Sequence, residues 1–78
     1  MLKGIQKYSV TLKGHRTSIS LEPLFWETLH QMAESQNKPL HTLISEIEET
    51  HLMEGIPGNL SSTLRLYILK ELLKYKSI

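Results

Sequence analysis

The sequence predicts an α+β domain that is mainly helical, and three observations lead to this fold class. Residues 8–21 alternate between apolar and polar side chains, which is typical of β-strands. Residues 23–53 carry apolar side chains at helical spacing on both sides of a short polar turn. A glycine- and proline-rich break at residues 54–59 precedes a third apolar run, which predicts a C-terminal helix. We therefore expect one domain over residues 1–78, with strands at about 8–12 and 16–21 and helices at about 23–36, 39–53 and 60–74.

The length of the chain favours association with a second copy. A chain of 78 residues is near the size at which a lone hydrophobic core becomes marginal. It has no cysteine, so neither disulfides nor a thiolate metal site can add stability. The sequence shows no apolar run of signal-peptide or membrane-spanning length, which predicts a soluble, cytoplasmic protein with no membrane partner.

The alternation in residues 8–21 predicts a hairpin with one apolar and one polar face. A type II′ turn at Gly14-His15 would pair Leu12 with Thr17, whereas a turn at Lys13-Gly14 would shift the pairing by two. Both registers leave the faces unchanged, because side chains alternate along a strand with a period of two. The polar face is then formed by Lys7, Ser9, Thr11, Lys13, Arg16, Ser18 and Ser20.

Proline residues mark the starts of the first two predicted helices. Pro23 and Pro39 suit the first helical turn, where a missing N–H costs little. Asn59 or Ser61 can cap the third helix. The leucines and isoleucine of residues 64–73 fall on two rows of that helix, which predicts burial on two sides and contact with a second subunit.

The net charge of +1 is unevenly distributed along the chain. Residues 1–21 contain four basic side chains and no acid, and residues 55–78 carry a net charge of +3. Residues 22–54 hold seven glutamates against one lysine. An acid-free segment that also carries the strand pattern indicates a partner with negative charge, although lysines near chain ends also aid solubility.

The sequence gives little support for catalysis. The four histidines form no i, i+4 pair and have no thiol beside them, so we expect no metal ion. No serine lies in a nucleophile elbow, and the glycines form no phosphate-binding loop. We therefore expect neither an enzyme nor a cofactor.

The predicted polar face has the chemistry of a DNA-reading ribbon. A two-stranded β-ribbon fits the major groove, where arginine binds guanine through two hydrogen bonds and serine bonds to several bases. Arg16, Ser18 and Ser20 are therefore candidates for base contacts. The alternative is an ordinary solvent-exposed strand.

The stretch RTSISLEPLFWETLHQMAESQNKPLHTLISEI, residues 16–47, resembles the ribbon-helix-helix superfamily of Arc- and MetJ-type DNA-binding proteins. With YSVTLKGHRTSISLE, FWETL and NLSSTLRLYIL, the chain is similar to a small bacterial subgroup of that superfamily with an extra C-terminal helix. The resemblance implies an intertwined homodimer whose paired strands place Arg16, Ser18 and Ser20 in the major groove. It also implies a phosphate contact at the start of the second helix, at Lys38, Leu40, His41 and Thr42. Pro39 departs from the serine-type cap that is usual in the family.

In a homodimer of this kind, both chains would contribute to one hydrophobic core beneath the ribbon. The residues expected there are Thr17, Ile19, Leu21, Phe25, Leu29, Leu43, Ile44 and Ile47.

A second strand in each chain would give the dimer a four-stranded sheet, which is too broad to enter a major groove whole. Its outer strands would have to twist back over the phosphates, where Lys7 and Lys13 are useful. Otherwise the outer strand blocks entry and the surface binds something else.

Two functions follow from these features. The first is a dimeric, sequence-specific transcription regulator that acts as a repressor by occupying operator DNA, where dimers can pair further. The alternative is an antitoxin-like or adaptor dimer that binds a protein partner without sequence-specific DNA readout.

Overall fold

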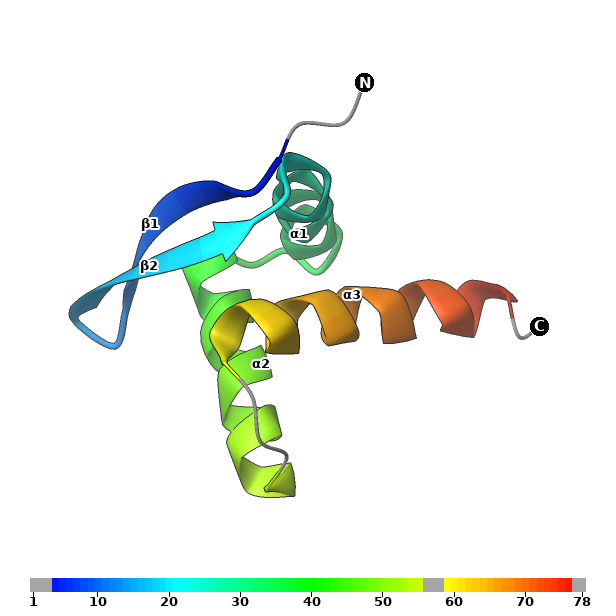
Figure 1. Cartoon of the computed structure of the whole chain (residues 1–78). Coiled ribbons are helices and arrows are strands. Elements are labelled where there is room, and N and C mark those ends of the chain that lie inside the picture. Colours follow the sequence, from blue (N-terminus) through cyan, green and yellow to red (C-terminus); the bar gives the residue numbers. More distant parts are fainter. Residues whose placement is uncertain (1–3, 56–58, 77–78) are drawn as a thin grey trace.

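A two-stranded antiparallel hairpin followed by three helices forms the fold, which confirms the predicted fold class. The computed structural model describes residues 4–55 and 59–76, so part of the predicted break at 54–59 lies outside the described residues. Figure 1 shows the hairpin lying across the helices. None of the helices in the described part of the chain is long and apolar enough to cross a membrane. The elements are β1 (Gln6–Leu12), β2 (His15–Leu21), α1 (Pro23–Ser35), α2 (Leu40–Glu54) and α3 (Leu60–Lys76).

The hairpin turns at Lys13-Gly14, and the alternative turn at Gly14-His15 is wrong. Both Lys13 and Gly14 have positive φ, 51° and 82°, as a type I′ turn requires. Leu12 accordingly pairs with His15. The type I′ turn is favoured because its twist matches the right-handed twist of the two strands. The two-residue shift leaves the predicted apolar and polar faces unchanged except at Lys13, which lies in the turn and not on the polar face.

The end of α1 is fixed by an asparagine in the left-handed region. Asn37 has a φ of 58° and donates its N–H to the Glu34 carbonyl at 3.0 Å. Lys38 donates to the Ala33 carbonyl at 3.1 Å, which completes a Schellman motif. The chain is thereby turned so that α2 returns beneath the hairpin.

Helix α2 begins at Leu40, one residue later than Pro39, where the sequence predicted its start. Pro39 is the N-cap and has an extended backbone, with ψ of 150°. Its carbonyl accepts hydrogen bonds from the N–H groups of Thr42 and Leu43 at 3.1 and 3.2 Å. Pro39 therefore accepts the first hydrogen bonds of the helix although it is not itself a helical residue. Gly55, with φ of 68°, ends the helix.

Helix α3 is capped by Asn59, the first of the two predicted candidates. The Oδ1 atom of Asn59 accepts from the N–H of Ser62 at 2.9 Å. This assignment leaves the hydroxyl of Ser61 available for another partner.

One hydrophobic core connects all five elements. Leu64 and Ile68 of α3 are fully buried against the residues that the sequence placed beneath the ribbon. Thr17 and Phe25, both expected in a dimer core, are only half-buried. A single chain therefore buries most of the core that was expected to require two chains. The buried hydrophobic residues are Leu12, Ile19, Leu21, Leu29, Ala33, Leu43, Ile44, Ile47, Leu64 and Ile68.

Candidate nucleic-acid interface

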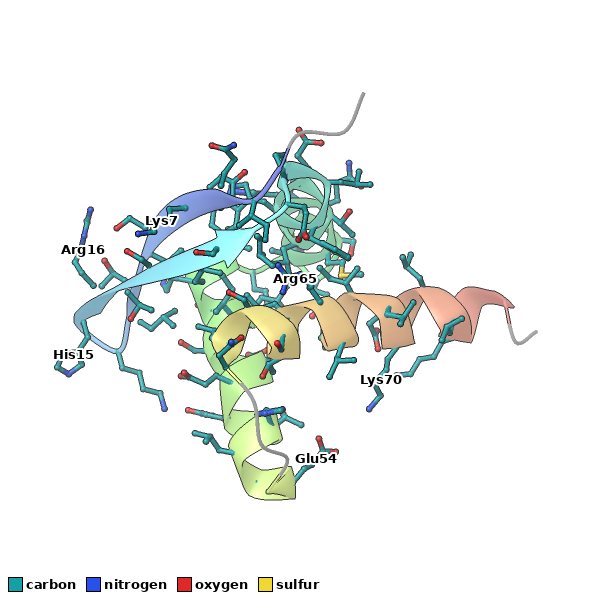
Figure 2. All side chains as sticks on the ribbon, in the orientation of Figure 1. Lys7, His15, Arg16, Glu54, Arg65 and Lys70 are labelled. Atoms are coloured by element: carbon teal, nitrogen blue, oxygen red, sulfur yellow. The ribbon has the colours of Figure 1, made fainter. Side chains whose placement is uncertain are left out.

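A continuous polar surface covers the side of the hairpin that faces away from the helices. In Figure 2, Lys7 and Arg16 lie on this side of the two strands. Neither β1 nor β2 contains an acidic residue, so the charge of this surface is positive. We call it the outer face; its cross-strand pairs are Thr11 with Arg16, Ser9 with Ser18, and Lys7 with Ser20.

The opposite side of the hairpin is fixed to the helices, which determines the direction of the outer face. Ile19 and Leu21 are buried in the core. The ring of Tyr8 stacks on Trp26 of α1, with centroids 4.2 Å apart and planes within 6° of parallel. The sequence pattern does not reveal this pair, because it identifies Tyr8 and Trp26 only as apolar residues.

The three predicted base-contacting residues are not equally accessible. Arg16 and Ser18 are exposed, whereas Ser20 is half-buried. Within the described part of the chain, Arg16 and Lys7 take part in no ion pair. These two cations are therefore available to an external anion.

The first turn of α3 lies against the end of β2. The N–H of Ser20 donates to the hydroxyl of Ser61 at 3.3 Å. Just beyond the strand, the Arg65 guanidinium pairs with the Glu22 carboxylate at 2.9 Å. Sequence reasoning missed this junction, because contacts between residues more than 40 positions apart leave no local pattern.

Two of the predicted phosphate-contacting lysines are engaged by glutamates of α2. Lys13 pairs with Glu49 at 2.9 Å, and the hydrogen bond and charge of Glu49 raise the pKa of Lys13. Lys38 pairs with Glu46 at 2.6 Å. The structure therefore does not bring Lys13 and Lys38 together with Lys7 on the outer face.

The start of α2 keeps part of the predicted anion-binding character. It has no side-chain cap, because Pro39 supplies none. The N–H of Thr42 already donates to Pro39, so the backbone donors of Leu40 and His41 are the better candidates for a phosphate. The side chain of His41 is exposed beside them.

A family model described as Ribbon-helix-helix domain matches residues 5–72 of the chain. The chain belongs to the ribbon-helix-helix family. The matched segment includes all of β1 and most of α3, so in this ribbon-helix-helix domain the hairpin and the third helix are part of the matched region. Comparisons with curated proteins and with solved structures found no match.

A second surface lies between α2 and α3, which diverge as Figure 1 shows. Their side chains enclose a groove of about 390 Å³ with acidic residues from both helices and lysines from α3. The Nε2 atom of His51 is buried there without a hydrogen-bond partner among the described residues. The charged residues that line the groove are Glu46, Glu54, Lys70, Glu71 and Lys74.

Proposed function

We propose that this ribbon-helix-helix protein is a dimeric, sequence-specific DNA-binding regulator that represses transcription by occupying operator DNA. The observation that carries the proposal is the outer face of the hairpin, which is free of acidic residues and exposes Arg16 and Ser18 two positions apart. Arginine and serine at this spacing on a strand can contact base edges in the major groove. Lys7, at the flank, would contact a phosphate.

The dimer would form through the edge of β2 that does not pair with β1. Two such strands, one from each chain, would lie antiparallel at the centre of a four-stranded sheet. The outer-face neighbours of Arg16 and Ser18 on β1 are Thr11 and Ser9, which are short. Short flanking side chains and the right-handed twist of the sheet would let the central ribbon approach the groove while β1 turns toward the phosphates.

Selection of binding sites from random duplex DNA, at about 0.15 M salt, tests this function. We expect the dimer to enrich one motif with two related half-sites. Arg16→Ala removes one bidentate base contact from each chain of the dimer, and each contact is worth roughly 1–3 kcal/mol. On the selected operator, affinity should therefore fall by about 30-fold or more. Binding to random duplexes should change much less.

Lys70→Ala is a matched control, because Lys70 is an exposed cation on α3, away from the outer face in Figure 2. It should not alter the preference for the operator. The proposal fails if the dimer enriches no motif, or if Arg16→Ala and Ser18→Ala leave operator binding unchanged.

A second candidate function is binding of a protein partner, as in an antitoxin-like or adaptor dimer. The exposed leucines of α3 favour it, because Leu66, Leu69 and Leu73 form an apolar row that is about half exposed. An exposed row of this kind should cause concentration-dependent association or bind an environment-sensitive dye. Neither effect is expected if the homodimer covers the row.

A further inference from the structure

The hydrogen bond between Ser20 and Ser61 reveals which backbone groups of β2 face away from β1. In an antiparallel pair, the N–H and C=O groups of successive residues point alternately toward and away from the neighbouring strand. The N–H of Ser20 points away from β1, since it donates to Ser61 on α3. The backbone groups of Ser18 and Arg16 therefore also point away from β1. We call this row the free edge of β2.

Two of the symmetric registers open to a second copy have their two-fold axis near the middle of β2. If the two-fold axis passes beside Ser18, that residue lies opposite its own copy, and Arg16 lies opposite Ser20 of the second chain. If the axis passes beside Thr17, Arg16 lies opposite Ser18 of the second chain. Both registers leave the predicted outer face unchanged, because each joins residues that project to the same side.

We propose that Ser61 ends the ladder between the two chains, so that the β2 strands pair about Thr17 with Arg16 opposite Ser18 of the second copy. This inference rests on the proposed dimer and adds its register. The Ser18 register requires the N–H of Ser20 to bond to the second chain, but that N–H is taken by Ser61.

The two ends of the free edge fit the Thr17 register. Opposite Ser20 this register places Gly14 of the second copy, where that chain has already entered its turn. The partner strand would thus end where the first turn of α3 begins. The Arg65–Glu22 pair, at 2.9 Å, holds α3 in this position one residue beyond β2.

The register determines how far apart the two arginines lie along the ribbon. About Thr17, the Arg16 residues of the two chains are offset by two residues, or about 7 Å, at roughly 3.3 Å per residue. About Ser18, the offset would be four residues, or about 13 Å. The proposal therefore places Arg16 and Ser18 of both chains in a compact cluster, and Ser20 at its margins.

Cysteine cross-linking distinguishes the registers without background, because the chain contains no cysteine. Opposite residues in a hydrogen-bonded pair have Cα atoms about 5.5 Å apart, within the usual disulfide range of roughly 4.4–6.8 Å. Diagonal neighbours are about 7–8 Å apart, which is beyond it. Arg16→Cys and Ser18→Cys both lie on the exposed outer face, so neither should disturb the core.

In the experiment, Arg16→Cys chains carry a mass label, so that they can be distinguished from Ser18→Cys chains. The two kinds of chain are unfolded, mixed, refolded together and oxidised in the absence of DNA. We expect a disulfide between the two kinds of chain and little between two Ser18→Cys chains. A predominant disulfide between two Ser18→Cys chains would overturn the Thr17 register but retain the ribbon. If a protein that is dimeric by size measurement forms no disulfide between any of these chains, the ribbon itself is wrong, and with it the dimer of the proposed function.

Ser61→Ala tests the role of Ser61 directly. Without the hydroxyl acceptor, the N–H of Ser20 becomes available to a second chain. We expect Ser18→Cys chains that also carry Ser61→Ala to cross-link with one another several-fold faster than Ser18→Cys chains with Ser61. An unchanged rate would show that Ser61 does not end the ladder.

Discussion

At the scale of single residues, the glutamates of α2 determine which cations are available to a partner. Glu49 and Glu46 hold Lys13 and Lys38 at 2.9 and 2.6 Å. A phosphate would have to compete with a carboxylate for either lysine. Lys7 and Arg16 have no ion pair within the described residues, so they can meet an external anion without that competition.

A pH-dependent contribution to stability is expected from Glu22, which joins the end of β2 to α3. Its own backbone N–H, and then the Arg65 guanidinium, hold the pKa of the Glu22 carboxyl below its ordinary value of 4.5. Because the folded pKa is lowered, this contribution is present above pH 4.5 and is lost as the pH falls through the lowered value. Urea unfolding should show Glu22→Gln less stable than wild type at pH 7, and this difference should shrink as the pH falls below 4.5.

Arg65→Gln is the companion variant for this measurement. It should reduce the pH dependence only in part, because the larger cause, the backbone N–H of Glu22, remains. A stability difference between wild type and Glu22→Gln that is independent of pH would contradict the assignment.

At the scale of the elements, the hairpin depends on one glycine. Gly14 has a φ of 82°, in the left-handed region, and open space around its Cα. Gly14→Ala should therefore cost about 1–2 kcal/mol of unfolding free energy through backbone strain alone. Gly4→Ala is the matched control, since Gly4 also has open space and has no positive φ, and it should cause no loss in urea unfolding. If Gly14→Ala and Gly4→Ala lowered the free energy of unfolding equally, a side chain at position 14 would not strain the turn.

Helix α3 should show two energetically different faces. Leu64 has no exposed surface, whereas Leu69 is 51% exposed. Leu64→Ala should cost about 2–5 kcal/mol in urea unfolding, because it removes buried contacts and leaves a cavity. Leu69→Ala should cost about 0.5 kcal/mol or less. Similar losses for both variants would mean that the outer row is also buried, as a covering partner would make it.

Local patterns in the sequence predict most of these elements, and long-range contacts explain the remainder. Strict alternation revealed both faces of the hairpin, because strand side chains have a period of two. It could not choose between the two turns, since both keep the same faces. The start of α2 was placed one residue early, because Pro39 is compatible with both the N-cap and the first helical position. The role of Ser61 was not predictable, since it depends on a contact with Ser20, 41 positions away.

The burial of the core shows a related limit. Apolar spacing identified Ile19, Leu43 and Ile44 as core residues, but it could not tell whether one chain or two would cover them. In the structure, Leu64 and Ile68 of α3 pack against these residues, so one chain covers much of the core. The use of the same apolar residues in a dimer stays a prediction.

At the scale of the whole molecule, charge is separated between the hairpin and the helix beneath it. The two strands contain basic but no acidic residues, whereas α2 contains four glutamates. Although the net charge is only +1, the hairpin side of the molecule should attract polyanions and the α2 side should repel them. This separation would orient the protein on DNA with the outer face first.

Salt dependence of DNA binding tests this orientation through Lys7. Each phosphate contact releases counterions and contributes about −0.9 to the slope of log affinity against log salt. Lys7→Gln removes one such contact from each chain of a dimer, so the slope should become less negative by about 2. Affinity should fall by similar factors on operator and random duplexes, because a phosphate contact carries no sequence information. Lys70→Gln, which removes a cation from α3, should leave the slope unchanged. An equal change of slope in both variants would mean that DNA approaches the molecule from more than one side, and that the charge separation does not orient it.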